Sequence, residues 1–259
     1  MLYKFLRRTA YKLGYDFSLR KLPQYAALKR ELKIPRDLEP EFVDIYTRCK
    51  DFTLTSVERM YALYQGVKHI HAHNIPGDLV ECGVWRGGSC MVMALTLLSL
   101  GDQSRKIYLY DTFAGMTRPD EVDIHLRDGS EQISRWELFQ QQDHNEWCYA
   151  PLQDVKRNLI STDYPQDSII FVEGDVESTI PACAPDKISL LRLDTDWFKS
   201  TYHELVHLFP RLSRNGVLVV DDYGAYEGSR KAVDRYFSEQ HQSILLHRID
   251  TAGRIGINA

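Results

Sequence analysis

Short apolar runs alternate with amphipathic stretches along most of this chain. Residues 79–82, 106–110, 168–172, 188–193 and 217–220 are mostly Leu, Ile, Val and Tyr. Runs of this kind are typical of strands that are buried on both faces of a parallel sheet. Helical spacing of apolar residues separates most of them, so the sequence predicts alternating strands and helices.

Helices are expected in the intervals between these strands. Ser56 and an early Glu58 precede apolar positions on one helical stripe, which predicts a helix that starts at residue 57 and ends before Pro76. Further helices are expected over 89–100, 152–159, 202–212 and 229–237, and closing strands over 244–248 and 253–257. The expected fold class is α/β, a doubly wound, mostly parallel seven-stranded sheet with a C-terminal antiparallel hairpin.

Residues 117–150 interrupt the alternation. They are polar and rich in Asp, Gln and His, with only local periodicity. Long insertions in compact α/β domains often cover a site, so a partly helical lid is expected here. The chain divides into a basic helical N-terminal extension over 1–50 and one domain over 51–259, which contains this insertion.

The composition is that of an ordinary globular protein, with 44% hydrophobic and 26% charged residues. No run approaches the roughly 18 apolar residues that a membrane span requires, and the first residues lack a secretory signal, so a cytoplasmic location is expected. The 5 cysteines lack the spacing of a disulfide framework or a zinc site and are expected to be reduced.

The charge is unevenly distributed. Residues 1–36 have ten Lys or Arg against Asp16 and Glu31, whereas the whole chain has a net charge of −4. A basic amphipathic segment can contact an anionic membrane surface or hold a phosphorylated substrate carrier. A solvated basic helix that covers the domain or a partner subunit is the preferred interpretation. A homodimer is expected, and no nucleic-acid partner.

Two pairs of aspartates follow the fourth and fifth predicted strands. Asp194 and Asp196 follow one strand, and Asp221 and Asp222 follow the other. The carboxyl ends of neighbouring parallel strands meet at one edge, so the four side chains should converge. Clustered carboxylates raise one another's pKa, and a bound cation is the usual compensation. The pattern predicts an oxygen-ligand metal site; helix capping is the alternative, although capping does not need paired acids.

A glycine-rich turn follows the first predicted strand. In residues 80–89 (VECGVWRGGS), Gly83 and Gly87 let backbone amides approach a ligand, and the helix start at Ser89 favours negative charge. The spacing differs from the dinucleotide fingerprint, so pyrophosphate binding fits poorly. The pattern acid-x-Gly-x-x-x-Gly from Glu81 is similar to the first motif of class I S-adenosylmethionine methyltransferases; an ordinary tight turn is the alternative.

Acids after the second and third strands fit a nucleoside ligand. Asp111, followed by Thr112, ends the second strand, where a carboxylate can accept both ribose hydroxyl hydrogens. Gly174 and Asp175 follow the third strand, where an acid can bond the adenine amino group or cap the next turn.

Polar residues of the first predicted helix could contact the cofactor or a metal. Ser56 and Glu58 either touch the methionine end of such a cofactor or only form the helix cap. His69 and His73 lie one helical turn apart, but no third ligand is evident, so a zinc site is not expected.

These motifs resemble the macrocin O-methyltransferase family, the TylF-type sugar methyltransferases of antibiotic biosynthesis. The matching segments are 53–59 (TLTSVER), 77–89 (GDLVECGVWRGGS), 110–116 (YDTFAGM), 171–176 (FVEGDV), 191–197 (LRLDTDW) and 219–224 (VVDDYG). They extend over about residues 50–257, whereas the first 40 residues match no motif. Ala114 stands where the family usually has an acid.

The resemblance implies a class I methyltransferase (Rossmann-like) fold, S-adenosylmethionine as donor, a helical lid and a divalent metal, Mg²⁺. By matching motif, the metal ligands are Asp194, Asp221 and Asp222. Asp196 becomes the candidate general base, with His125 or His144 of the lid as the alternative. The expected cofactor contacts are Ser56, Glu58, Glu81, Gly83, Gly87, Ser89, Asp111, Thr112, Gly174, Asp175 and Asp194.

The expected reaction is methyl transfer to a hydroxyl of a sugar or glycoside. Magnesium prefers carboxylate and water oxygens and can leave positions open for two substrate hydroxyls. Another vicinal diol, such as a catechol, is therefore an alternative acceptor. A non-catalytic cofactor-binding partner protein is the alternative outside enzymes.

Overall fold

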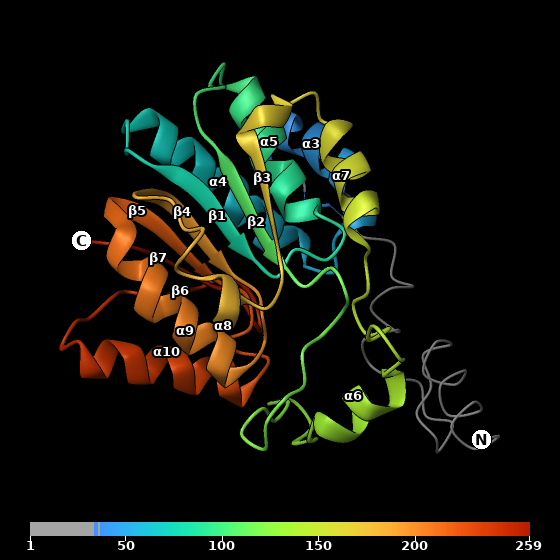
Figure 1. The fold of residues 1–259 in the computed structure, drawn as a ribbon. Helices are drawn as coiled ribbons and strands as arrows, with labels where there is room; N and C mark the ends of the chain where they lie inside the picture. The colour runs from blue at the N-terminus through green and yellow to red at the C-terminus, as the bar shows by residue number, and fades with distance from the viewer. Residues whose placement is uncertain (1–33, 36) are drawn as a thin grey trace.

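A seven-stranded sheet forms the centre of the protein, in the order β3-β2-β1-β4-β5-β7-β6 (Figure 1). The strands are β1 (Asp78–Cys82), β2 (Ile107–Asp111), β3 (Ile169–Glu173), β4 (Ile188–Leu193), β5 (Leu212–Val220), β6 (His247–Arg248) and β7 (Arg254–Ile257). The first five pair in parallel, and β7 runs antiparallel to both β5 and β6. The predicted α/β fold class and closing hairpin are confirmed.

The structure is a computed structural model that describes residues 34–35 and 37–259. The basic segment for which membrane or partner contact is predicted lies almost entirely outside these residues. Within them, no helix combines the length and apolar character that crossing a bilayer requires.

Helices cover both faces of the sheet. They are α3 (Pro40–Cys49), α4 (Val57–Ala72), α5 (Gly88–Ser99), α6 (Ile133–Phe139), α7 (Leu152–Ile160), α8 (Val176–Thr179), α9 (Phe198–Leu208) and α10 (Glu227–Glu239), with 3-10 turns η1 (Lys50–Phe52), η2 (Gln166–Ser168) and η3 (Phe209–Arg211). Residues of α3, α4, α5 and α7 share one hydrophobic core, and residues of α9 and α10 share a second.

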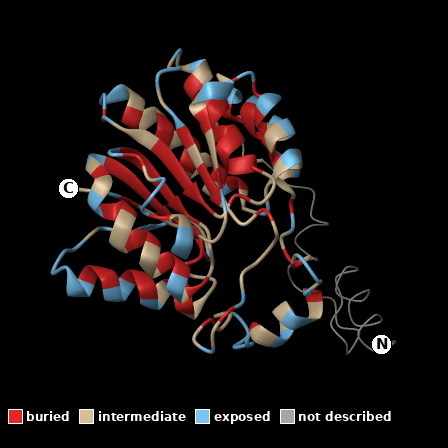
Figure 2. Ribbon diagram, in the orientation of Figure 1, coloured by how far each residue is buried: buried red, intermediate tan, exposed pale blue. Residues whose placement is uncertain are grey.

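The two cores exist because side chains alternate along each buried strand. Leu190 of β4 and Val217 of β5 belong to the first core, whereas Leu191 and Leu218, one residue further on, belong to the second. Every residue of β4 is buried as a result. Figure 2 shows the central strands mostly buried, with helices buried on their inner sides.

Several boundaries differ from the sequence prediction. Helix α9 begins at Phe198 rather than 202, and β5 begins at Leu212 because that residue pairs with Ile188 across a register shift. Only two residues form β6, since Ile244 and Leu246 pack against the second core instead of pairing.

Helix α3 belongs to the core of the domain, although the sequence prediction assigned residues 1–50 to an extension. Phe42, Tyr46 and Cys49 are at most 1% exposed and lie in the core that contains α5. One face of this helix is apolar and buried, and the net charge of the N-terminal residues gives no indication of that face. All five cysteines are free thiols.

We expect Asp102→Asn to lower the free energy of unfolding by about 1.5–3 kcal/mol, the usual contribution of charged hydrogen bonds. Asp102 accepts hydrogen bonds from Ser104 and, at 2.9 Å, from Arg105 Nε, and Arg105 in turn holds the carbonyl groups of Ile75 and Gly77. Urea unfolding would measure the loss.

The pH dependence of this difference checks its cause. Burial opposes the shift, but hydrogen bonds from Ser104 and Arg105 lower the pKa of Asp102 to about 2. A carboxyl with a lowered pKa stabilises the fold fully above its unfolded pKa of roughly 4 and loses this contribution as the pH falls through the folded pKa. The difference between wild type and variant should therefore be smaller at pH 3 than at pH 8; an equal difference at both would contradict this account.

Candidate active site

Four aspartates meet at the carboxyl ends of β4 and β5. Asp194, Asp221 and Asp222 each place a carboxylate oxygen within 4.8 Å of the others, and the carboxyl groups of Asp196 and Asp222 share a hydrogen bond. The convergence follows from the pairing of β4 with β5 in parallel up to their last residues. The predicted acid cluster is present.

None of the four acids caps a helix. The residue that precedes α9 is Trp197 and the one that precedes α10 is Tyr226, and neither helix has a side-chain cap. The capping interpretation of the aspartate pairs therefore finds no support.

A buried arginine lies beneath the cluster. Arg192 of β4 is 2% exposed and pairs with Glu81, with Asp194 at 2.8 Å and with Asp221 at 2.7 Å. Burial would lower the pKa of its guanidinium, but Asp194 and Asp221 raise it well above the ordinary value. The positive charge of Arg192 thus links Glu81 of β1 to Asp194, which follows β4, and to Asp221, which follows β5.

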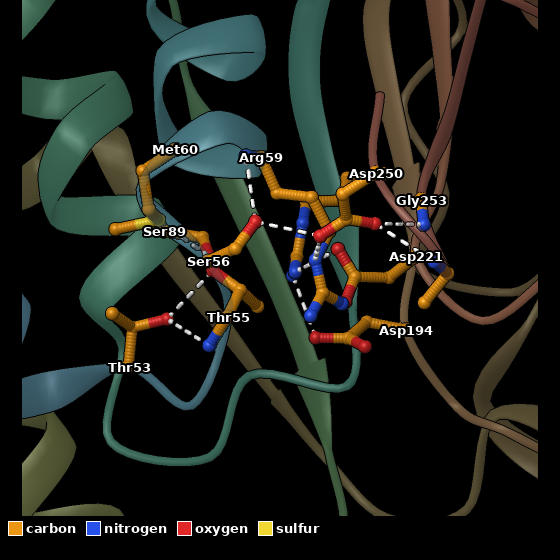
Figure 3. A network of polar contacts seen from close by, with 12 residues as sticks. Thr53, Thr55, Ser56, Arg59, Met60, Ser89, Asp194, Asp221, Asp250 and Gly253 are labelled. Carbon is orange, nitrogen blue, oxygen red and sulfur yellow. Dashed lines mark hydrogen bonds and ion pairs between the residues drawn. The ribbon is translucent and has the colours of Figure 1, made fainter. Parts of the chain in front are cut away.

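A second arginine joins the cluster to the C-terminal hairpin (Figure 3). Arg59 of α4 pairs with Asp221, and its Nε lies 3.0 Å from Asp250 Oδ2. The Ser56 hydroxyl donates to the same oxygen at 2.6 Å, while the backbone amide of Gly253 donates to Asp250 Oδ1 at 2.7 Å. The start of α4 and the loop before β7 are therefore held against the acid cluster.

The two arginines do not neutralise all the acids. Burial raises the pKa of Asp194 and Asp222 well above the ordinary value, and repulsion from Asp221 adds to this. Asp222 Oδ2 is buried and has no hydrogen-bond partner among the residues that the structure describes. Since an unpaired buried carboxylate oxygen is costly, this group of residues fits a bound cation.

Beside the acids lies a pocket at the ends of β1, β2 and β3. Of the predicted cofactor residues, it is lined by Gly83, Asp111, Thr112, Gly174, Asp175 and Asp194. Gly83 has φ +82, and an added Cβ would lie 2.0 Å from the Asp194 carbonyl oxygen. Only glycine lets the turn after β1 approach the turn after β4 so closely.

The family model of macrocin O-methyltransferase (TylF) matches residues 45–255. The chain belongs to this family. It is an O-methyltransferase that uses S-adenosylmethionine, as the sequence motifs predict.

Individual relatives agree with this assignment. The 8-demethyl-8-(2,3-dimethoxy-alpha-L-rhamnosyl)-tetracenomycin-C 4'-O-methyltransferase of Streptomyces olivaceus is 33% identical over 201 residues, which cover 78% of this chain and 73% of the relative. The demethyldecarbamoylnovobiocin O-methyltransferase of Streptomyces niveus is 32% identical over 71% of this chain and 67% of the relative. The solved structure of the O-methyltransferase NovP has a TM-score of 0.71 and 25% identity, covering 100% of this chain and 98% of that one.

Asp111 of the methyltransferase already organises the glycine turn. Its Oδ2 accepts from the amides of Val84 at 2.7 Å and Trp85 at 3.0 Å, and its Oδ1 accepts from Phe113 at 2.7 Å. Each carboxylate oxygen has two lone pairs, so Oδ2 is fully used and only Oδ1 retains capacity to accept, from one of the two ribose hydroxyls that were predicted.

Asp175 has a capping role. It caps α8 through the amide of Glu177 at 2.9 Å, as the turn-capping interpretation predicts, and it also lines the pocket. Contact with an adenine amino group stays a prediction.

Other predicted cofactor residues do not line this pocket. Glu81 is buried beneath it with Arg192 and Cys90 as partners. Ser56 is the cap of α4, accepting from the amide of Arg59 at 3.1 Å, and Glu58 is exposed in the first turn of that helix. Two more pack against side chains of other helices: Ser89, whose hydroxyl lies 3.7 Å from Met60 Sδ, and Gly87, where an added Cβ would lie 2.6 Å from Leu159 Cδ2.

The predicted lid is attached to the acid cluster by backbone hydrogen bonds. The amide of Leu126 donates to Ala225 at 2.8 Å, and the amide of Glu227 donates to Ile124 at 2.8 Å. Buried Asp123 accepts from the amide of Phe198, the first residue of α9. Because Ala225 and Glu227 come shortly after Asp222 in the chain, the lid is attached to the segment that carries two of the acids.

The two lid histidines have partners within the lid. His125 Nδ1 lies 3.0 Å from Asp128, and His144 Nδ1 lies 2.8 Å from Asp143. Asp196 has φ +65, a hydrogen bond with Asp222 and a pKa that burial raises to about 7. The choice between Asp196 and a lid histidine as the base stays a prediction.

Arg59 and Arg192 were not among the residues predicted from sequence. A charged residue inside an apolar strand run is a recognisable signal, since a buried arginine requires acidic partners. Arg59 carries no such signal, because its helix position resembles an ordinary exposed one.

Proposed function

We propose that this protein transfers a methyl group from S-adenosylmethionine to a hydroxyl of a sugar or glycoside, with a divalent cation such as Mg²⁺ held by Asp194, Asp221 and Asp222. The observation that supports this most directly is the convergence of these three carboxylates beside the predicted cofactor pocket.

The acceptor class is supported by what relatives act on. One relative is named for the 4' position of a rhamnosyl group on a tetracenomycin, and another for the 3'' position of mycinamicin III; the latter, from Micromonospora griseorubida, is 29% identical over 78% of this chain. A cytoplasmic location and a homodimer stay predictions.

In the proposed complex, Asp194, Asp221 and Asp222 hold the cation. Asp221 already accepts from Arg59 and Arg192, but each of its oxygens has a second lone pair. A bound Mg²⁺ supplies Lewis-acid polarisation, which makes nearby acceptor hydroxyl groups more acidic.

Asp196 acts as the general base. Its carboxylate removes the proton of the acceptor hydroxyl, and the oxygen attacks the sulfonium methyl carbon in line. The carbon–sulfur bond breaks with its electrons left on sulfur, which produces S-adenosylhomocysteine. The turns that carry Gly83 and Asp194 position donor and acceptor, and positioning contributes much of the rate.

Asp196→Asn should lower kcat by about 100- to 10,000-fold, the usual contribution of general acid–base catalysis. KM for S-adenosylmethionine should change little, because Asp196 does not line the predicted cofactor pocket. Steady-state kinetics with a labelled methyl donor would measure both. Near-wild-type kcat in this variant would assign the proton transfer to another group.

The proposal is tested by incubating the protein with labelled S-adenosylmethionine, Mg²⁺ and saccharide extracts of its own host. We expect label in a glycoside fraction, loss of transfer with EDTA and recovery on adding Mg²⁺. Full transfer after exhaustive chelation would refute the metal, and label only in catechol-like products would refute the sugar acceptor.

A further inference from the structure

Arg135 of the lid has a buried donor atom and no acidic partner in the described part of the chain. Arg135 of α6 places its guanidinium carbon 3.9 Å from the centroid of the Trp147 ring. Its Nε is buried without a hydrogen-bond partner, and no carboxylate lies at ion-pair distance among residues 34–35 and 37–259. Because buried donors are nearly always satisfied, this one calls for an acceptor from outside the described chain.

The ring beneath this guanidinium packs against a residue next to the candidate base. Trp197, which Trp147 contacts, directly follows Asp196 in the chain. Trp147 packs edge-on against Trp197, with ring centroids 5.6 Å apart, and Trp197 packs in the same way against Tyr226 at 5.2 Å. Arg135 thus lies at one end of a series of packed rings whose other members, Trp197 and Tyr226, come from the segments that follow β4 and β5.

The geometry of this arginine suits an anion. A guanidinium presents its N–H groups as a planar fork that matches the two oxygens of a carboxylate or phosphate. The other two arginines of the site, Arg59 and Arg192, are already paired with acids. An anionic acceptor would be repelled by the aspartate cluster unless a separate cation held it.

We infer that the acceptor is an acidic saccharide, with a carboxylate or phosphate group near the methylated hydroxyl, and that Arg135 binds this group. The inference rests on the proposed function and narrows its substrate class. The donor's own carboxylate has the same chemistry, so the experiment must separate the two sources.

The test compares saccharides that differ only in the acidic group, namely methyl glucuronoside with methyl glucoside and glucose 6-phosphate with glucose. Binding is measured calorimetrically with S-adenosylhomocysteine and Mg²⁺ present, and transfer is measured with S-adenosylmethionine. In the wild type, we expect the acidic member to bind about 10- to 100-fold more tightly, the range of charged hydrogen bonds. Arg135→Gln should remove this preference and leave the neutral member nearly unchanged.

Two further variants make the result specific. Arg135→Lys keeps the charge but not the fork and should restore only part of the preference. Arg127→Gln removes an exposed arginine from the same lid and should leave the preference intact.

Three outcomes would overturn the inference. They are equal binding of acidic and neutral members by the wild type, equal loss of both in Arg135→Gln, and weaker donor binding in that variant with the preference retained, which would assign Arg135 to the donor carboxylate. Tight binding of the acidic probe without transfer would count against the proposed reaction alone.

Discussion

Asp222→Ala should abolish methyl transfer, with kcat/KM reduced by about 1000-fold or more, because a bound cation supplies several kcal/mol to the reaction. Asp222 is one of three carboxylates within 4.8 Å of one another, and it has a buried oxygen with no partner in the described chain. Affinity for S-adenosylmethionine should stay nearly intact, since Asp222 does not line the predicted cofactor pocket. Calorimetric titration with Mg²⁺ and with the donor would separate the two effects.

The same variant should not destabilise the metal-free protein. Burial and the neighbouring acids raise the pKa of Asp222, so the native fold gains nothing from its charge. Removing a group that serves function at a cost in stability typically leaves a protein at least as stable. Asp167→Ala, which removes an exposed carboxylate of η2, is the control and should keep full activity. Full activity of Asp222→Ala in the presence of EDTA would end the metal hypothesis.

Arg192→Met should lower the free energy of unfolding by about 3–5 kcal/mol, the usual result of removing one partner from a buried ion pair. The substitution leaves Glu81, Asp194 and Asp221 without the cation that they share. The loss affects Glu81 most, because burial raises its pKa and Arg192 is its only cationic partner in the described chain. Urea unfolding of the metal-free protein measures the change.

A double variant tests whether the loss arises from the uncompensated charge. Glu81→Gln/Arg192→Met should be less destabilised than Arg192→Met, because one of the acids left unpaired has been neutralised. Additive losses from the two substitutions would show that Arg192 acts through packing alone. Mg²⁺ should also stabilise Arg192→Met more than wild type, since a cation could replace part of the missing charge.

Much of the fold can be predicted from the sequence because its signals are local. The buried strands appear as apolar runs, the start of α4 appears in Ser56 and the residues that follow, and the close turn after β1 appears in Gly83. The aspartate cluster is also predictable, since residues that follow neighbouring parallel strands must end at one edge of the sheet.

Contacts between segments far apart in the sequence needed the tertiary structure. Nothing in the sequence near Arg59 indicates its pairing with Asp221, 162 residues away. The attachment of the lid between Leu126 and Ala225 is a backbone contact and leaves no trace in residue type. The position of Arg135 over Trp147 depends on how α6 folds back within the lid.

One physical reason separates the features that the sequence predicts from those that needed the tertiary structure. Strand burial, caps and glycine turns depend on the backbone conformation of a few adjacent residues, which their own side chains favour. Charge compensation and acceptor recognition depend on which side chains become neighbours after the sheet has formed and the lid has packed onto it. The local pattern thus determines the type of fold and the place of the acid cluster, whereas the tertiary contacts decide which cations pair with those acids and where Arg135 lies in the lid.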